Sequence, residues 1–369
     1  MHGEKIKKFK IESKYLNIIR PEEVVRLGIL REGIQLVTNE IRLPIYGQVI
    51  PRIELDLVGS YFNKRVTARI NQESHFLYNG ERIQAMINDE IIHVNAKLCF
   101  DESRNKVGMY NFGMMRENGA RSFVFDYHTY CCYSCKFCFK ENEWENHLIE
   151  GTDEKNYELN FNNCIEYVQN NSSKLKKDYD IIWLCTGSIL DYKLELYRNC
   201  KIANTLRQEG YTGQIYLSQV IPNDVVIKKS VRTDFFKEIK RAGINRFNSG
   251  IEIVNPYKRN ELINGYKKNI KLEDYLMVFK DAINVFGNHN VGSCLLVGIE
   301  EANDTISALE KLAKLGVVPA PTVFTPFVTK QLQIPFVLSL DDLVYTHIEF
   351  NRIINLYNLP VFSGVFSLA

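Results

Sequence analysis

Three cysteines stand at short, regular intervals near the middle of the chain. Cys131, Cys135 and Cys138 have the spacing C-x3-C-x2-C. Thiolate is the preferred ligand of iron–sulfur clusters, so three thiolates on one short loop can each bind one iron of a four-iron cluster. The fourth iron then has no protein ligand, and its open position is available for chemistry. The spacing therefore predicts an iron–sulfur centre that binds a reactant rather than one that only transfers electrons.

The same segment leaves a zinc site open as a second interpretation. Cys132 adds the spacing C-x2-C-x2-C, and zinc sites also use closely spaced cysteines. The fourth zinc ligand would be His128 or Cys132. Outside this segment, however, the sequence contains no C-x2-C or H-x3-H pair. We therefore favour iron and interpret Cys132 as a bystander.

The remaining cysteines do not indicate a disulfide framework. The total of nine is odd, the chain is long, and no secretory signal is visible. Five cysteines stand alone: Cys99, Cys164, Cys185, Cys200 and Cys294. We interpret each of these as a small buried apolar side chain.

Neither the net charge nor the hydropathy indicates binding to nucleic acid or insertion into a membrane. The 46 basic and 44 acidic residues leave a formal charge of +2, so no nucleic-acid partner is expected. No apolar run reaches the roughly 18 residues that a membrane span needs. The segment from Met1 to Lys10 is polar and basic, with no apolar stretch behind it. We therefore expect a cytoplasmic protein.

Beyond residue 120, apolar strands alternate with amphipathic helices. The expected strands are Ser122–Tyr127, Ile181–Thr186, Gln214–Val220, Arg246–Val254, Val291–Gly298 and Val317–Phe324. The expected helices are Asn156–Lys174, Leu194–Gln208, Arg232–Ala242, Leu272–Val285 and Thr305–Leu315. Repeated strand–helix units build a parallel sheet whose functional edge is formed by the carboxyl ends of its strands. Six units are too few for a closed eight-stranded barrel, so we predict an α/β fold with a partial (β/α)6 TIM-type barrel. Pro319 and Pro321 place the last strand at an edge.

Before residue 120 the pattern is mostly that of an antiparallel sheet. Segments rich in branched and aromatic residues are Gln48–Gly59, Lys64–Asn71 and Glu90–Phe100. Asn79-Gly80 is typical of a hairpin turn, and Asn88-Asp89 is a weaker turn signal. Pro21–Arg31 has the start of a helix.

These patterns divide the chain into three parts. Residues 1–118 are expected to form a mostly β accessory domain, residues 119–330 the partial barrel, and residues 331–369 a helical extension or lid. The accessory domain is open to three interpretations: a recognition module for substrate or partner, a lid, or structural packing on the open edge of the barrel.

The cysteine motif resembles that of the radical S-adenosylmethionine (SAM) superfamily, in which an aromatic residue precedes the last cysteine, as Phe137 does here. The overall pattern is most similar to the biotin-synthase-like branch. The resemblance implies an oxygen-sensitive enzyme with a [4Fe-4S] cluster held by Cys131, Cys135 and Cys138. It also implies that SAM binds the open iron and is cleaved reductively to a 5′-deoxyadenosyl radical, which removes a hydrogen atom from a substrate. The electron would come from a flavodoxin- or ferredoxin-type donor.

The strand ends supply candidate contacts to SAM. These candidates are Phe137, Thr186, Gly187, Ser188, Ser218, Gln219, Glu252, Val297 and Gly298. The resemblance places Phe137 beside the adenine, Thr186-Gly187-Ser188 at the amino group, and Glu252 at the ribose or the carboxylate. From the residues themselves, Leu296 and Val297 would form an apolar wall, and Gly298 would let the backbone approach the ring.

Glu252 has an independent physical argument. In an extended strand its side chain would point away from those of Ile251 and Ile253. A buried carboxylate is costly unless it is paired, so the side chain is expected to face a polar cavity. The alternative is an ion pair with a nearby base such as Arg259.

Three functions follow for comparison. The first is a radical SAM enzyme with one cluster that acts on a small organic molecule, because the isolated cysteines contain no pair for a second cluster. The second is a radical SAM enzyme that modifies a peptide or protein held by residues 1–118. The third is a non-catalytic protein in which the cysteines hold zinc.

Overall fold

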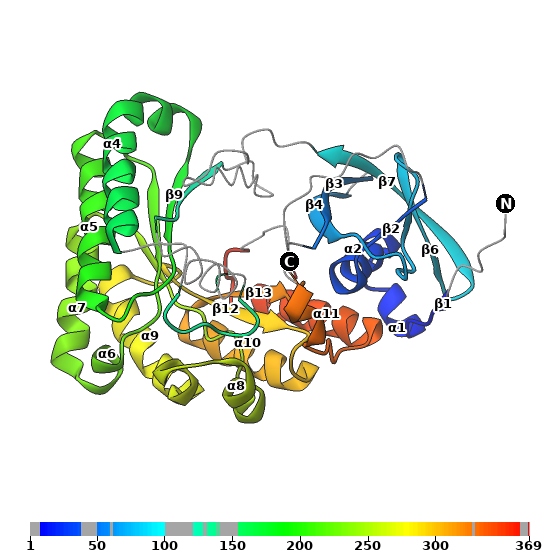
Figure 1. The fold of residues 1–369 in the computed structure, drawn as a ribbon. Coiled ribbons are helices and arrows are strands. Elements are labelled where there is room, and N and C mark those ends of the chain that lie inside the picture. Colours follow the sequence, from blue (N-terminus) through cyan, green and yellow to red (C-terminus); the bar gives the residue numbers. More distant parts are fainter. Residues whose placement is uncertain are drawn as a thin grey trace.

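The computed structural model describes residues 8–37, 50–59, 62–99, 121–127, 131–138, 140, 154–326, 329–361 and 368. His128, the alternative zinc ligand, lies outside these residues. Figure 1 shows a small sheet built around helix α2 beside a larger α/β unit with its helices on the outside. In the part of the chain that is described, no helix combines the length and the apolar character needed to cross a membrane.

The N-terminal sheet is mostly antiparallel, as predicted. Its strands are β1 (Lys8–Phe9), β2 (Gln35–Leu36), β3 (Arg52–Gly59), β4 (Phe62–Arg69), β5 (Leu77–Tyr78), β6 (Arg82–Ile87) and β7 (Glu90–Cys99). They run in the order β2-β5-β6-β7-β3-β4, with β1 added on β6. Helices α1 (Ser13–Leu16) and α2 (Pro21–Glu32) precede most of the strands, and α2 packs against β4 and β7.

Both predicted turns are present. Asn79-Gly80 connects β5 to β6, with Gly80 in a left-handed conformation at φ 101°. Asn88-Asp89 connects β6 to β7, and both residues have positive φ, at 48° and 67°. Two consecutive left-handed residues are the conformation that a tight two-residue hairpin requires, and Asn and Asp tolerate it better than other non-glycine residues.

The larger unit is a six-stranded parallel sheet in half-barrel form, which confirms the predicted fold class. Its strands are β8 (Ser122–Phe125), β9 (Ile181–Cys185), β10 (Gln214–Ser218), β11 (Arg246–Asn248), β12 (Val291–Val297) and β13 (Val318–Val323). They lie side by side in chain order from β8 to β13. All five pairings are parallel, so the carboxyl ends of the strands share one edge. β13, which contains Pro319 and Pro321, is an edge strand of this sheet, as predicted.

Helices cover the outer face of this sheet (Figure 1). They are α4 (Glu154–Asp178), α5 (Tyr192–Gln208), α7 (Lys229–Arg241), α9 (Leu272–Phe286) and α10 (Ala302–Leu315). The other helices of this part are α6 (Asn223–Ile227), α8 (Pro256–Leu262) and α11 (Leu340–Leu356), and α11 packs on α10 and α2. The described residues also form two short 3-10 helices, η2 (Tyr266–Asn269) and η3 (Thr329–Gln333). Each predicted helix is present with small shifts at its ends.

The two faces of the sheet differ in burial. Side chains toward the helices are fully buried and apolar, among them Phe125, Leu184, Leu217, Phe247 and Leu295. They alternate with partly exposed side chains that face inward: Trp183, Cys185, Ser218, Asn248, Cys294, Leu296 and Thr322. Because side chains alternate between faces along a strand, this pattern shows that the inner face of the half-barrel is open and partly polar.

One strand is shorter than predicted. The expected strand Arg246–Val254 ends at Asn248, and the chain then turns sharply around Glu252, which has φ 62°. The Ile253 N–H donates to the carbonyl of Ile251 across this γ-turn at 2.8 Å. An isolated bridge connects Glu252 to β12. The Glu252 N–H donates to the Cys294 carbonyl at 2.9 Å, and the Glu252 carbonyl accepts from the Leu296 N–H at 2.7 Å. The alternation argument for Glu252 was therefore wrong, because the backbone there is not extended.

The N-terminal sheet and the end of the chain meet across α2 and α11. Arg31 Nε donates to the Leu338 carbonyl at 2.9 Å, and the Thr325 hydroxyl donates to the Leu30 carbonyl at 3.1 Å. Arg26 donates to the carbonyl of Leu368, a fully buried residue, at 3.0 Å. Helix α2 therefore lies beside the carboxyl end of β13, at the edge of the half-barrel that carries the site.

Candidate functional site

The cysteine segment forms a compact loop at the carboxyl end of β8. Two turns shape it, with the Ser134 N–H donating to the Cys131 carbonyl at 3.1 Å and the Cys138 N–H donating to the Cys135 carbonyl at 2.9 Å. Ser134 has a left-handed φ of 43°. Cys131, Cys132, Cys135 and Cys138 are all free thiols.

This loop is fixed to the ends of other strands. The Cys132 N–H donates to the Ser188 carbonyl after β9 at 2.8 Å, and the Lys136 N–H donates to the Leu262 carbonyl at 2.9 Å. An apolar cluster completes the contact. It contains Tyr133, Cys135, Ile253, Leu262, Ile263, Ile299 and Phe324, with Cys131, Cys132, Phe137, Cys138, Val220, Leu296 and Phe336 packed against it. Residues that follow β8, β10, β11, β12 and β13 thus meet around the thiols.

The donor set fits an iron–sulfur cluster chemically. Burial raises the pKa of Cys135 to about 11 and that of Cys138 to about 12. These two thiols are therefore protonated at neutral pH, and binding of a metal must displace their protons. Among the described residues, no three His, Cys, Asp or Glu side chains are already arranged to hold a metal ion. The loop brings the three thiols into one cluster but does not place them as a finished metal site.

Glu252 lies beside this loop in a buried ion pair. Its carboxylate contacts Lys267 Nζ at 2.5 Å, and the Lys267 side chain is 4% exposed. Burial alone would lower the pKa of Lys267, but the Glu252 carboxylate raises it above its usual value. Lys267 also favours the thiolate of Cys135 electrostatically. The ion pair therefore places a cation and an anion close to one of the candidate ligands, and the cation has the larger effect on the Cys135 thiol.

Arg259, the base considered from the sequence, has a different task. It donates to the carbonyls of Ile251 and Ile253, each at 2.8 Å, and to that of Lys267 at 2.6 Å. These bonds hold both sides of the γ-turn, which otherwise costs conformational energy at a non-glycine residue. Arg259 therefore positions Glu252 through the backbone, and the partner of the carboxylate is Lys267.

The turn after β9 contains a buried carboxyl group that the sequence did not single out. Glu195, in the first turn of α5, accepts a hydrogen bond from the Ile189 N–H at 3.1 Å. Its second oxygen has no partner among the described residues. Burial raises the pKa of Glu195 to about 8, and a contact to Ser188 opposes the shift. Glu195 thus contacts Ser188, one of the predicted SAM contacts, and the residue that follows it.

Two predicted SAM contacts, Ser218 and Gln219, lie at the carboxyl end of β10 and differ in whether their polar atoms are already hydrogen-bonded. Ser218 accepts a hydrogen bond from the indole N–H of Trp183 at 2.8 Å, so its oxygen is already engaged. Gln219 is 4% exposed, and neither its amide oxygen nor its amide nitrogen has a partner among the described residues. Buried polar groups are almost always paired, so an unpaired buried amide is typical of a site that binds a ligand.

Leu296 and Val297, the two residues of the predicted apolar wall, lie on opposite faces of the sheet. Val297 is fully buried in the core between sheet and helices, whereas Leu296 packs on the cysteine loop. Of the predicted apolar wall, only Leu296 faces the site. Gly298 has φ 104°, and a Cβ atom there would lie 2.2 Å from the Phe336 ring. The space above Gly298 is therefore occupied by Phe336, which the sequence analysis did not identify.

Phe137 packs against the same apolar cluster as the three cysteines. Ser188 is connected to this cluster because its carbonyl accepts a hydrogen bond from the Cys132 N–H. Glu252 is connected to it because the next residue, Ile253, belongs to the cluster. Val297 lies on the opposite face, in the core between sheet and helices.

Comparisons with known proteins concern the fold. No family model matches the sequence, and no curated protein matches it. Solved structures that resemble it include two of a maturase. One is the FeFe-hydrogenase maturase HydG from Carboxydothermus hydrogenoformans, with 16% identity, a TM-score of 0.42, and coverage of 64% of this chain and 52% of that one. The other is a structure of HydG, a maturase of the [FeFe]-hydrogenase, with 14% identity, a TM-score of 0.45, and coverage of 64% and 49%.

The chain thus spans about half the length of these two maturases. At this identity and these TM-scores, the likeness tells nothing about activity.

Proposed function

We propose that this protein is a radical SAM enzyme whose single [4Fe-4S] cluster is held by Cys131, Cys135 and Cys138. One observation carries the proposal: a loop with three closely spaced free thiols lies at the carboxyl end of the first strand of a parallel half-barrel, packed against the ends of the other strands. Ligands of α/β folds bind at this edge, where loops from several strands converge.

When bound, the cluster would supply one electron to SAM and so generate a 5′-deoxyadenosyl radical. The residues of the chain would bind SAM and shield the reactive centre from water. Gln219 offers an unpaired amide to the polar part of SAM, and Phe137 and Leu296 offer apolar surface to the adenine. The surrounding apolar cluster excludes water from a reactive centre, as such chemistry requires.

We further propose a small organic molecule as the substrate and a flavodoxin- or ferredoxin-type protein as the electron donor. The inner face of the half-barrel supports the substrate class. It is partly exposed and has small polar side chains and thiols at Cys185, Asn248, Cys294 and Thr322. Such a surface suits a compact ligand that makes a few directed hydrogen bonds.

Anaerobic reconstitution tests the proposal. The full chain is supplied with iron and sulfide, reduced with dithionite and mixed with SAM, and 5′-deoxyadenosine is quantified by chromatography. We expect about four irons per chain and formation of 5′-deoxyadenosine. Tightly bound zinc with no iron, or a reduced cluster that leaves SAM intact, would contradict the proposal.

Gln219→Leu tests the predicted SAM contact. We expect the Kd for SAM to rise about tenfold, which corresponds to about 1.4 kcal/mol. The iron content should not change, and the free energy of unfolding should stay equal or increase, because a buried unpaired amide is removed. Gln214→Leu is the matched control, since Gln214 is exposed at the opposite end of the same strand. Equal Kd values for Gln219→Leu and the unmodified protein, measured by equilibrium dialysis, would exclude this contact.

A further inference from the structure

A short segment before α11 lies against the end of β12. The Val337 N–H donates to the Gly298 carbonyl at 2.7 Å, and the Phe336 ring takes the place of the side chain that Gly298 lacks. Phe336 and Ile334 also pack against the apolar cluster that contains the cysteines. The segment from Ile334 to Leu338 is therefore part of the wall around the candidate site, although it lies outside the strand–helix repeats.

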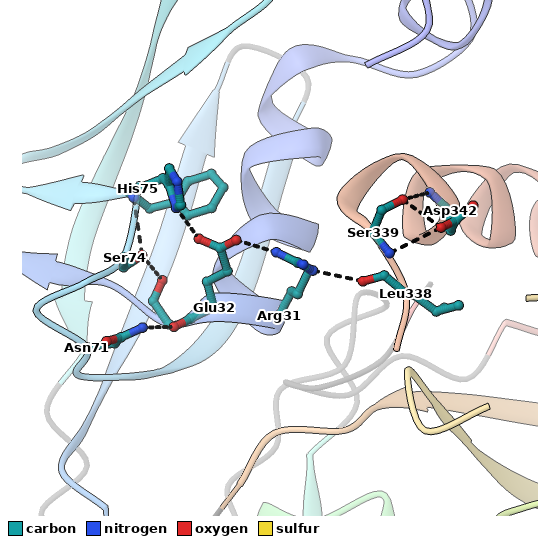
Figure 2. Close-up of polar contacts among 10 residues, drawn as sticks. Arg31, Glu32, Asn71, Ser74, His75, Leu338, Ser339 and Asp342 are labelled. Carbon is teal, nitrogen blue, oxygen red and sulfur yellow. Dashed lines mark hydrogen bonds and ion pairs between the residues drawn. The ribbon is translucent and has the colours of Figure 1, made fainter. Parts of the chain in front are cut away.

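One side chain of the N-terminal part contacts this segment twice. Arg31, at the end of α2, has its guanidinium carbon 5.8 Å from the centre of the Phe336 ring. Its Nε donates to the Leu338 carbonyl at 2.9 Å, which Figure 2 shows. A guanidinium group close to an aromatic ring is attracted by the π-electrons, and the hydrogen bond fixes its orientation. Arg31 thus holds both the ring and the backbone that follows it.

Arg31 is itself held by the N-terminal sheet. Glu32 forms an ion pair with Arg31, and its other oxygen lies 2.6 Å from His75 Nδ1 (Figure 2). Asn71 donates to the Glu32 carbonyl at 2.8 Å, and Ser74 donates to the Gly33 carbonyl at 2.8 Å. These contacts come from the chain between β4 and β5, so the sheet orients the guanidinium before any ligand arrives.

The other end of the segment is fixed as well. Ser339 caps α11, because its hydroxyl accepts from the Asp342 N–H at 3.0 Å while the Asp342 carboxylate accepts from the Ser339 N–H at 3.1 Å. This capping box anchors the residue directly after Leu338 (Figure 2). Phe336 therefore lies on a short bridge between two fixed points, the Gly298 carbonyl and the start of α11.

We propose that Arg31 is a positioning residue for the SAM site: it holds Phe336 as the aromatic wall against which the adenine lies, so that the N-terminal domain completes the cofactor pocket of the barrel. This inference rests on the proposed function. It assigns the accessory domain a direct part in binding SAM.

The test compares variants of the reconstituted full-length protein. In Arg31→Ala we expect the Kd for S-adenosylhomocysteine, which cannot be cleaved, to rise about tenfold, with unchanged iron content. Amide hydrogen exchange at Val337 should accelerate even without ligand. Phe336→Leu should weaken binding to a similar degree, and the double variant should be no weaker than the weaker single variant, because both changes remove one contact.

Arg65→Ala is the matched control. Arg65 pairs with Asp56 at 2.8 Å on the same sheet but does not contact the segment, so its Kd and the exchange at Val337 should equal those of the unmodified protein. Arg31→Lys keeps a charge beside Glu32 but loses the planar guanidinium. It distinguishes loss of the contact from misfolding, and it should bind the ligand with intermediate affinity.

The outcomes separate the two proposals. If the unmodified protein holds iron and binds the ligand but Arg31→Ala binds equally well, the role of Arg31 is refuted and the radical SAM assignment stands. If the unmodified protein assembles no cluster and binds no ligand, the assignment itself fails and the role of Arg31 fails with it. Additive effects of Arg31→Ala and Phe336→Leu would also refute the coupling.

Discussion

Replacing Cys131, Cys135 or Cys138 by alanine is expected to reduce 5′-deoxyadenosine formation to the background of the assay and to lower the iron content of the reconstituted protein. In the proposed site each thiolate would bind a different iron of the cluster, so none could substitute for another. Cys135 itself is almost fully buried in the apolar cluster. Iron and acid-labile sulfide are measured together with the product.

Cys132→Ala is the control for these three variants. Cys132 takes part in the loop through its backbone N–H, which binds the Ser188 carbonyl and is kept in the alanine variant. We therefore expect Cys132→Ala to retain cluster and product. An inactive Cys132→Ala together with an active Cys131→Ala would reverse the ligand assignment.

Lys267→Met is expected to have the largest effect on stability. The change leaves the Glu252 carboxylate beside the cysteine loop without its cation, and removing one partner of a buried ion pair typically costs about 3–5 kcal/mol. The free energy of unfolding is measured by urea denaturation of the unreconstituted protein. A double variant, Glu252→Gln with Lys267→Met, should recover part of the loss because no unpaired charge remains.

Lys258→Met provides the matched control for this experiment. Lys258 pairs with Glu261 at 3.4 Å on the surface, and both side chains are substantially exposed. Exposed pairs contribute about 0–1 kcal/mol, so the control should be nearly neutral. Equal losses in Lys258→Met and Lys267→Met would mean that the Glu252–Lys267 pair is not a buried, mutually dependent pair.

Most of the fold was predictable because its signals are local. Each strand of the half-barrel is a short apolar run bounded by polar turns, and each helix has one apolar face, so the alternation can be read from the order of residues. The same holds for the cysteine loop, whose candidate ligands lie within eight residues. A hairpin such as Asn88-Asp89 needs only its own two residues to define the turn.

What the sequence did not reveal depends on contacts between distant segments. The stretch around Glu252 has the composition of a strand, but Arg259 draws in two of its carbonyls and bends it into a γ-turn. Lys267, in a 3-10 helix, contacts Glu252 fifteen residues earlier in the chain. This separation matches neither the helical nor the strand period, so the sequence does not indicate the contact. Phe336 reaches Gly298 across 38 residues, so no local pattern announces it.

The contact between α2 and the start of α11 also has a consequence for biosynthesis. Arg31 and Leu338 are 307 residues apart, so at about 5–20 residues per second the ribosome needs roughly 15–60 seconds to supply the second after the first. During that interval the surface of α2 that will meet α11 stays uncovered, and nascent chains with such surfaces are prone to aggregate. Slow translation or low chaperone capacity should therefore reduce the yield of native protein. The reduction should be larger than for a half-barrel that does not depend on a contact between the two ends of the chain.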